Sequence, residues 1–231
     1  MQILQVRHHK GTVHIAFNLD RFITDWQSAQ QKFISGIVHN FHDWQPIRAG
    51  DFTLAPAFAL QDLRCECKLF RGACSLVLTP EALRLDFENV TPQVEPIVSE
   101  TIRRAWRWFV EALEDHGLAW SSFQTLSHME ALETNAIDVD SYLGQFVSEE
   151  TGKLVEPDIC LPSTRLVLVG SGEWVLYRVV EKSKLVDKGV FVDTRVEIQS
   201  SDLSLDDQMK LLFHARTQSA KALGLDTKSD D

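Results

Sequence analysis

The sequence predicts an α+β fold, in which antiparallel sheets built from hairpins are packed against two or three long amphipathic helices. Three patterns support this prediction. Several segments alternate apolar and polar residues with period two, which is typical of half-buried strands. Other segments repeat apolar residues every three or four positions, which is typical of amphipathic helices. The strand and helix patterns also recur in a similar order in the two halves of the chain, so the prediction includes an internal pseudo-repeat.

The composition limits the size and the location of the protein. The chain has 231 residues, of which 44% are hydrophobic and 24% charged, and this is enough to build a sizeable core. We expect a single α+β domain over residues 1–231, or two similar halves (1–117 and 118–225), with a disordered tail at 226–231. The sequence contains no run of about 18 apolar residues and no secretory signal pattern at its start. A cytoplasmic location without membrane attachment is therefore expected.

The charge balance bears on the kind of partner. The chain carries 23 basic and 33 acidic residues, which gives a formal net charge of −10. Proteins that bind duplex nucleic acid usually have a positive surface, so we do not expect direct nucleic-acid binding. One basic cluster interrupts the acidic background, and it either lies on a solvated helix face or forms a local patch: Arg103, Arg104 and Arg107.

The segment RCECKLFRGACS, residues 64–75, holds three of the four cysteines of the chain. Period-two alternation places all three on one apolar face of a hairpin together with leucines: Cys65, Cys67 and Cys74. A two-residue turn at 71–72 puts Leu69 opposite Cys74 and Cys67 opposite Leu76. A structural zinc site needs four ligands, and no fourth ligand lies nearby in the sequence. We therefore favour a role in the core over a metal or redox site.

A first hairpin is predicted at the N-terminus, where alternating segments at residues 4–8 and 12–19 flank Lys10-Gly11. This turn places His9 and His14 on the polar face of the hairpin. A histidine cluster there could bind a metal or act as an acid or base. We favour the simpler interpretation, in which these side chains lie in solvent.

Residues 20–41 are predicted to form an amphipathic helix, because apolar residues recur there at helical spacing. The buried stripe contains Phe22, Trp26, Ala29, Phe33, Ile37 and Phe41. His39 and His42 lie three positions apart near the end of this helix, and Asp43 follows. These three residues are weak candidates for a metal site, because a pair of histidines needs a third ligand that the sequence does not clearly supply.

Residues 93–116 are predicted to form a second helix that ends at Gly117. Its buried stripe contains Ile97, Ile102, Ala105, Phe109 and Leu113. The tryptophans at 106 and 108 cannot both join this stripe, so one of them is expected at its edge or at an interface. Tryptophan and arginine are frequent in binding hot spots. The sequence thus predicts a partner-binding site at Arg103, Trp106, Arg107 and Trp108.

The second half of the chain is predicted to contain strands at 118–137, a short helix capped by Asp138, and a further strand at 190–199. Two more strands are joined at residues 170–172. Although this junction is rich in glycine, a strand follows it, so we interpret it as a hairpin turn and not as a phosphate-binding loop. A last helix begins at Ser204 and carries Asp207 in its first turn, which is typical of a capping box.

The pseudo-repeat compares residues 83–118 with residues 191–225, each of which is predicted to be a strand, a polar link and a long helix that ends in Gly-Leu. Three segments carry a wider likeness: CSLVLTPEALRLDF, IDVDSYLGQF and LSLDDQMKLLFHAR. In their order and spacing, over most of residues 65–220, the chain resembles a sporadically distributed bacterial family of unknown function. Where that family tends to have a strand rich in Gly, Arg and Asn, this chain has FQTLSHMEAL. The resemblance implies an α+β fold and a bacterial setting, and it supplies no catalytic residues.

Two classes of function are consistent with these patterns. The first is a non-catalytic cytoplasmic module that recognises another protein, as an antitoxin, a chaperone-like factor or a component of a defence system does. It assigns no catalytic residue and no cofactor, and it leaves a homo-oligomer open. The second is a metal-dependent hydrolase or nuclease, motivated by His39, His42 and Asp43 and by the pair Asp138 and Asp140. A nucleic-acid-binding subunit of a larger assembly is a further alternative.

Overall fold

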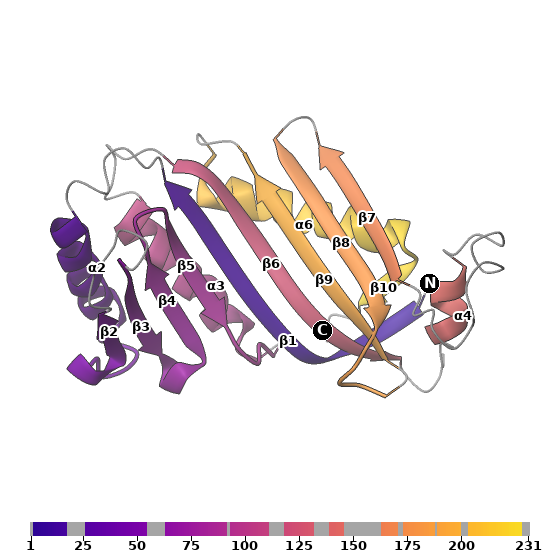
Figure 1. Cartoon of the computed structure of the whole chain (residues 1–231), viewed down its shortest axis with the longest axis horizontal. Helices are drawn as coiled ribbons and strands as arrows, with labels where there is room; N and C mark the ends of the chain where they lie inside the picture. The colour runs from indigo at the N-terminus through magenta and orange to yellow at the C-terminus, as the bar shows by residue number, and fades with distance from the viewer. Residues whose placement is uncertain are drawn as a thin grey trace. The chain divides into compact units, whose positions relative to one another are not determined.

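The computed structural model describes residues 2–17, 26–54, 63–91, 93–110, 118–131, 139–145, 163–170, 173–187, 189–199 and 203–227. It confirms an α+β fold with a large antiparallel sheet, whose strands follow the hydrogen-bonded order β2-β3-β4-β5-β1-β6-β9-β8-β7 (Figure 1). The chain forms two compact units. Unit 1 comprises residues 1–10, 124–196 and 209–231, and unit 2 comprises residues 11–123 and 197–208. The two sequence halves expected above remain a prediction.

Unit 2 is built from short antiparallel strands and two helices. Its strands include β2 (Phe52–Leu54), β3 (Cys65–Leu69), β4 (Cys74–Leu78), β5 (Ala82–Phe87) and the second part of β1 (Gln2–Phe17). Its helices are α2 (Trp26–Phe41) and α3 (Glu95–Ala105), and α3 continues into a π-helical turn at Trp106–Val110. Short 3-10 turns at Ala49–Asp51 and Phe70–Gly72 precede β2 and β4.

The cysteine hairpin has the register that the sequence predicts. Leu69 pairs with Cys74, and Cys67 pairs with Leu76. All three thiols are buried, since Cys65 and Cys67 are 0% exposed and Cys74 is 1% exposed. Arg71 and Gly72 both adopt positive φ in the turn, which is the backbone conformation that closes a tight hairpin. The period-two pattern was therefore sufficient to place this hairpin.

The predicted N-terminal hairpin is wrong, because β1 runs without a turn from Gln2 to Phe17. Residues 11–16 pair with β5, and residues 2–4 pair in parallel with β10 (Leu225–Thr227). Ladder partners on both sides of Lys10 and Gly11 keep this dipeptide extended. In a continuous strand His9 and His14 point to opposite faces, so they do not form the polar cluster that the hairpin implied.

The helices of unit 2 bury most of the predicted stripes. In α2 the buried residues are Ala29, Phe33, Ile37 and Phe41, as predicted, whereas Trp26 is only half-buried and Phe22 lies outside the described residues. In α3 Ile102 and Ala105 are buried, but Ile97 is 44% exposed and its predicted burial is wrong. Thr101 is buried instead, and its hydroxyl donates a hydrogen bond to the Ile97 carbonyl at 2.7 Å. That bond satisfies the hydroxyl and lets a polar residue occupy the core face.

Unit 1 contains the longer strands and the C-terminal helix. Its elements include β7 (Ser163–Gly170), β8 (Trp174–Lys182), most of β6 (Leu118–Ala131) and β9 (Gly189–Ile198), the short helix α4 (Val139–Gly144), and all but the first turn of α6 (Leu205–Ala222). The two strands on either side of residues 170–172 pair antiparallel, as predicted, with Gly170 opposite Trp174. Ser204 caps α6 as predicted, because its hydroxyl accepts from the Asp207 amide at 3.2 Å. Part of the expected disordered tail, Asp226 and Thr227, instead pairs with β1.

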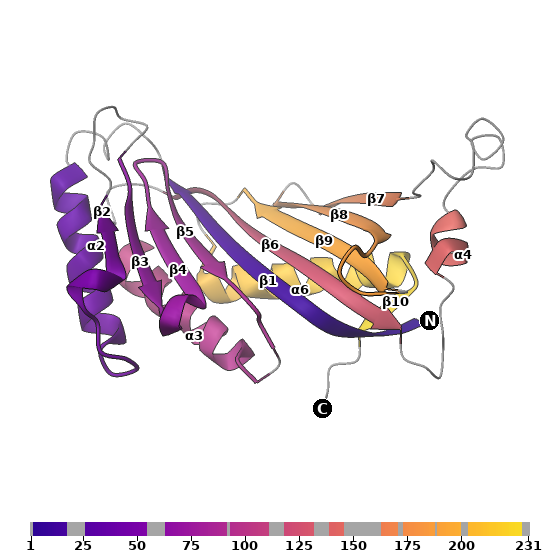
Figure 2. The same ribbon diagram turned by 60° about the horizontal axis from the view of Figure 1, so that its bottom comes forward.

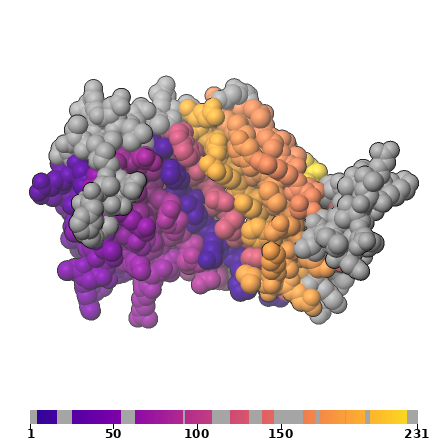
Figure 3. All heavy atoms as spheres, in the orientation of Figure 1, coloured from indigo at the N-terminus to yellow at the C-terminus, as the bar shows by residue number. Residues whose placement is uncertain are grey.

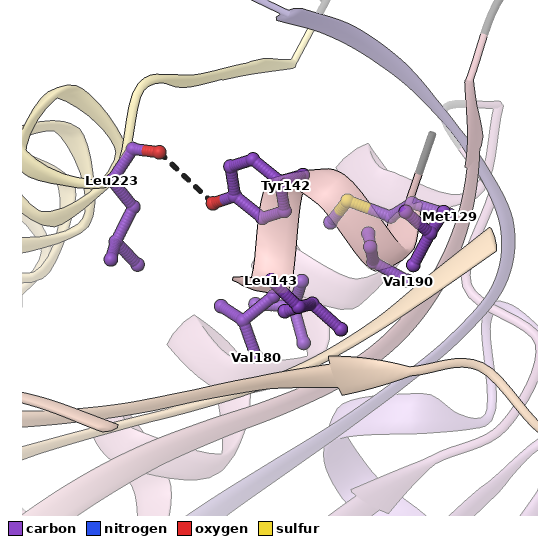
Figure 4. Packing of buried hydrophobic residues seen from close by; sticks show 8 residues of the cluster. Met129, Tyr142, Leu143, Val180, Val190 and Leu223 are labelled. Carbon is purple, nitrogen blue, oxygen red and sulfur yellow. Dashed lines mark hydrogen bonds between the residues drawn. The ribbon is translucent and has the colours of Figure 1, made fainter. Parts of the chain in front are cut away.

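The core of unit 1 joins α4 and the end of α6 to the sheet (Figure 4). Its members are Met129, Val139, Tyr142, Leu143, Val180, Val190, Val192 and Leu223. The Tyr142 hydroxyl donates a hydrogen bond to the Leu223 carbonyl at 2.9 Å, which ties α4 to the end of α6. Helix α6 covers the face of β8 and β9 that contributes side chains to this core (Figure 2). The other face of β7, β8 and β9 forms a continuous surface (Figure 3). Strand β7 has two exposed valines, Val167 at 47% and Val169 at 69% exposed.

No helix in the part of the chain that the structure describes has the length and apolar character needed to cross a membrane.

Candidate partner-binding site

The predicted partner-binding residues lie where α3 passes into the π-helical turn of unit 2. Arg103 and Arg107 are both exposed, and residues four positions apart on a helix are neighbours. Neither guanidinium forms an ion pair with any of the described residues. Like charges at this spacing repel each other by a few tenths of a kcal/mol, so the pair lowers the stability of the helix slightly. The geometry leaves both cations available to a partner.

The tryptophans of the predicted site face inward. Trp106 is 5% exposed and belongs to the buried row of α3. Trp108 is half-buried and lies against α2, where its ring centroid is 6.0 Å from that of Phe33. The π-helical turn changes the angle between successive side chains, so both indoles reach apolar surroundings although they are only two positions apart. A partner would therefore meet chiefly the two arginines.

Arg104 is held in place by several neighbours, in contrast to the two arginines that flank it in this cluster. Its Nη1 donates hydrogen bonds to both Asp43 carboxylate oxygens, at 2.8 and 3.0 Å, and to the Asn40 carbonyl at 2.6 Å. Its Nε contacts Glu100 at 3.1 Å, and its guanidinium carbon lies 4.0 Å from the centroid of the Trp44 ring. Arg104 thus links α3 to the C-terminal end of α2, where backbone carbonyls favour a cation.

The proposed metal ligands near the end of α2 are engaged in other contacts. The hydrogen bond from Arg104 is the main cause that lowers the pKa of Asp43 below its usual range. His42 lies 2.9 Å through its Nδ1 from the His39 carbonyl, and the two imidazole centroids are 6.4 Å apart. Among the described residues, no group of three or more His, Cys, Asp or Glu side chains is arranged to hold a metal ion.

The pair Asp138 and Asp140, the second motif behind the enzyme hypothesis, is described only in part. Asp140 forms an ion pair with Lys182, whose Nζ lies 3.0 Å from Oδ1. Asp138 lies outside the described residues. Asp140 thus has a structural partner on β8, and it ties α4 to that strand.

The cysteines of the hairpin have poorly reactive surroundings. Burial raises the pKa of Cys65 to about 11 and that of Cys67 to about 12, and it raises the pKa of Cys74 as well. A thiol must lose its proton to become a good nucleophile or metal ligand, and these three are protonated near neutral pH. Their position therefore fits the predicted role in the core. Cys160 lies outside the described residues.

Replacing Arg104 by alanine is expected to lower the free energy of unfolding by about 2 kcal/mol, because it removes a cation–π contact and several charge-assisted hydrogen bonds. The matched control is Arg103→Ala, which removes an exposed arginine from the neighbouring position and should change stability by less than about 0.5 kcal/mol. Urea unfolding of the two variants measures both values. Equal stabilities would show that the Arg104 contacts contribute little in water.

The role of Arg104 could not be read from the sequence, because its partners lie more than sixty positions away at Asp43 and Asn40. A weak signal was present, since an aromatic residue and an acid, Trp44 and Asp43, follow a predicted helix end. Comparison with protein-family models finds no family that matches the chain, and comparison with curated proteins finds no match either.

Proposed function

We propose that the protein is a non-catalytic binding module that recognises another protein through an acidic surface of that partner. The observation that carries the proposal is the exposed pair Arg103 and Arg107, which no acid among the described residues neutralises. Arg104 lies between them in the sequence and differs from them, because its guanidinium is held by contacts at the C-terminal end of α2. Antitoxins, chaperone-like factors and defence components are the classes of binding module that fit this proposal.

Electrostatics support an acidic epitope for this site. The whole chain carries a net charge of −10, so an acidic partner is repelled by most of the surface and attracted at the arginine pair. Complementary charges at the rim of an interface mainly raise the association rate and make it sensitive to salt. The two arginines would therefore orient the partner and speed its association.

The test uses the partner that co-purifies with the chain from its host, identified by native mass spectrometry as a stoichiometric complex. The double variant Arg103→Glu, Arg107→Glu is expected to weaken binding of that purified partner at least tenfold, with most of the change in the association rate. The affinities are measured by surface plasmon resonance at two salt concentrations.

The matched control is Lys32→Glu, Lys68→Glu, because both lysines are exposed on unit 2. Each double variant replaces two positive charges by two negative ones, so the net charge changes from −10 by −4 to −14 in both. The control should bind almost as well as the wild type. If a folded Arg103→Glu, Arg107→Glu variant also binds like the wild type, this surface is not the binding site.

We further propose that the two halves of the chain are copies of one unit. The first half has the order β1-α2-β3-β4-β5-α3, apart from the short β2, and the second has β6-α4-β7-β8-β9-α6. The strand order repeats too, since β1 lies beside β5 as β6 lies beside β9. This shared order supports the pseudo-repeat better than residue identity does. Membership of the sporadically distributed bacterial family remains a proposal based on the three segments quoted above.

A further inference from the structure

Strand β8 carries an arginine in a row where its alternation calls for apolar side chains. Trp174, Leu176 and Val180 are buried on the face of β8 that α6 covers, and Arg178 lies in the same row with 6% of its surface exposed. Arginine is almost never this deeply buried unless a group of opposite charge accompanies it. The position therefore needs a physical explanation that the fold alone does not supply.

The contacts of Arg178 use a small part of its capacity. Its Nε donates a hydrogen bond to Thr194 Oγ1 on β9 at 2.9 Å. Thr194 is itself 3% exposed, so this bond fixes the guanidinium plane against the sheet. Among the described residues, no acceptor takes the four N–H groups on the two Nη atoms. These four donors form the planar fork that binds carboxylate or phosphate oxygens in pairs.

The charges around this fork are positive. Burial, assisted by the nearby cation Arg216 on α6, lowers the pKa of Arg178 to about 10, while Tyr142 acts in the opposite direction. No carboxylate of the described residues is among the groups that influence it. Arg216 also acts on His9 of β1, which burial keeps neutral near pH 7. The charges of Arg178 and Arg216 thus repel each other, and an anion bound to Arg178 would offset this repulsion.

The side of α6 that faces the sheet carries small residues close to Arg216. Its buried row is Leu212, Ala215, Ser219 and Leu223, with the two small residues in the middle. The Ser219 hydroxyl is turned onto its own helix, where it donates to the Arg216 carbonyl at 2.8 Å. A compact ligand group would lie beside these two small side chains.

We propose that Arg178, oriented by Thr194 and assisted by Arg216, binds a small oxyanion, namely a phosphate or carboxylate group. All three residues belong to unit 1, so this site is separate from the arginine pair of unit 2, and it can fail or hold independently of the proposed partner binding. A bidentate contact with the Arg178 fork supplies the specificity. The charge of Arg216 adds affinity without a fixed geometry.

The test measures binding of inorganic phosphate, and separately of citrate, to the full chain by isothermal titration calorimetry and thermal denaturation. Wild type is expected to show a saturable heat, with a melting temperature raised by about 5 to 10 °C at a hundredfold excess over the dissociation constant. Phosphate also stabilises proteins without binding them, through exclusion from their surface. Arg178→Met is expected to show only the stabilisation by exclusion, which does not saturate. In the wild type, the anion that binds with the lower dissociation constant shows whether the site prefers a phosphate or a carboxylate group.

The matched control is Arg165→Met, which removes an exposed arginine from the neighbouring strand β7 and should bind like the wild type. If Arg178→Met does not fold, Thr194→Val replaces it. That variant keeps the buried charge but loses the acceptor that orients the guanidinium, so its affinity should fall about tenfold. The proposal is overturned if the wild type shows no saturable response to either anion, or if the folded variants at 178 and 194 respond as the wild type does.

Discussion

Replacing Gly36 by alanine should destabilise the protein by about 2 to 3 kcal/mol and lower its melting temperature by roughly 5 to 10 °C. This result is the opposite of the usual one, because alanine in place of glycine inside a helix normally stabilises it by about 0.5 to 1 kcal/mol. The difference lies in Trp108. A Cβ on Gly36 would overlap its indole, with Cζ3 at 2.7 Å and Cδ2 at 2.9 Å. Since Phe33 also packs on this indole, the ring has little room to move away.

A double-mutant cycle isolates this contact. In a Trp108→Ala background the obstructing ring is gone, so Gly36→Ala should become stabilising by about 0.5 to 1 kcal/mol. Gly50→Ala serves as the control, because a Cβ there meets no atom within 4 Å and its effect should be small in either background. Urea unfolding of the wild type, the two single variants, the double variant and Gly50→Ala in both backgrounds gives the free energies of unfolding that the cycle compares. The packing argument fails if Gly36→Ala has the same sign with and without Trp108.

This contact also shows what a sequence pattern can and cannot predict. The helical spacing placed Phe33, Ile37 and Phe41 in the core of α2 correctly. It could not place Trp108, because the π-helical turn at Trp106–Val110 changes the angle between side chains and leaves no recognisable mark in the sequence. The local pattern therefore predicted helix α2 and its buried face. The orientation of the Trp108 indole depends on packing against this neighbouring helix and could not be predicted.

The two hairpins predicted at Lys10-Gly11 and Arg71-Gly72 had different outcomes for a similar reason. Alternation and a glycine turn were present at both Lys10-Gly11 and Arg71-Gly72, yet only the second forms a hairpin. Gly72 has φ of +90°, whereas Gly11 lies within a strand that pairs with β5. The choice was made by strand partners at residues 82–87 and 225–227, which are far away in the sequence. Long-range pairing overrides a local turn signal when both sides of the turn can find partners.

The candidate sites also differ in how far they could be predicted from neighbouring residues in the sequence. Exposed Arg103 and Arg107 lie within one basic cluster and could be predicted from it. Arg178 is not among the residues predicted from the sequence, although the alternation of β8 places this cation between Leu176 and Val180. The signal was available as a charged residue on the apolar face of a strand. Its interpretation needed Arg216 and Thr194, which are brought to it by α6 and β9.

Acidification from pH 7 to pH 4 should destabilise the protein in part through His9. Burial, assisted by the charge of Arg216, lowers the pKa of His9 from 6.5 to about 4, while the imidazole contacts Ser127 Oγ at 2.6 Å. Above pH 6.5 the histidine is neutral in both the folded and the unfolded chain. Between about 6.5 and 4 the unfolded chain binds a proton that the folded chain does not, so stability falls as the pH falls.

His9→Asn should remove this part of the pH dependence, because asparagine does not titrate and can still hydrogen-bond to Ser127. The difference in unfolding free energy between wild type and variant should therefore change between pH 7 and pH 4, by at most about 3 kcal/mol in favour of the variant, and level off below pH 4. His214→Asn is the control, since His214 is exposed on α6 and should leave the wild-type slope unchanged. Parallel curves for wild type and His9→Asn would mean that His9 titrates alike in the folded and unfolded chain. Carboxylates also titrate in this range, but they are common to all three proteins and cancel in the difference, so the remaining slope reports the burial of one imidazole.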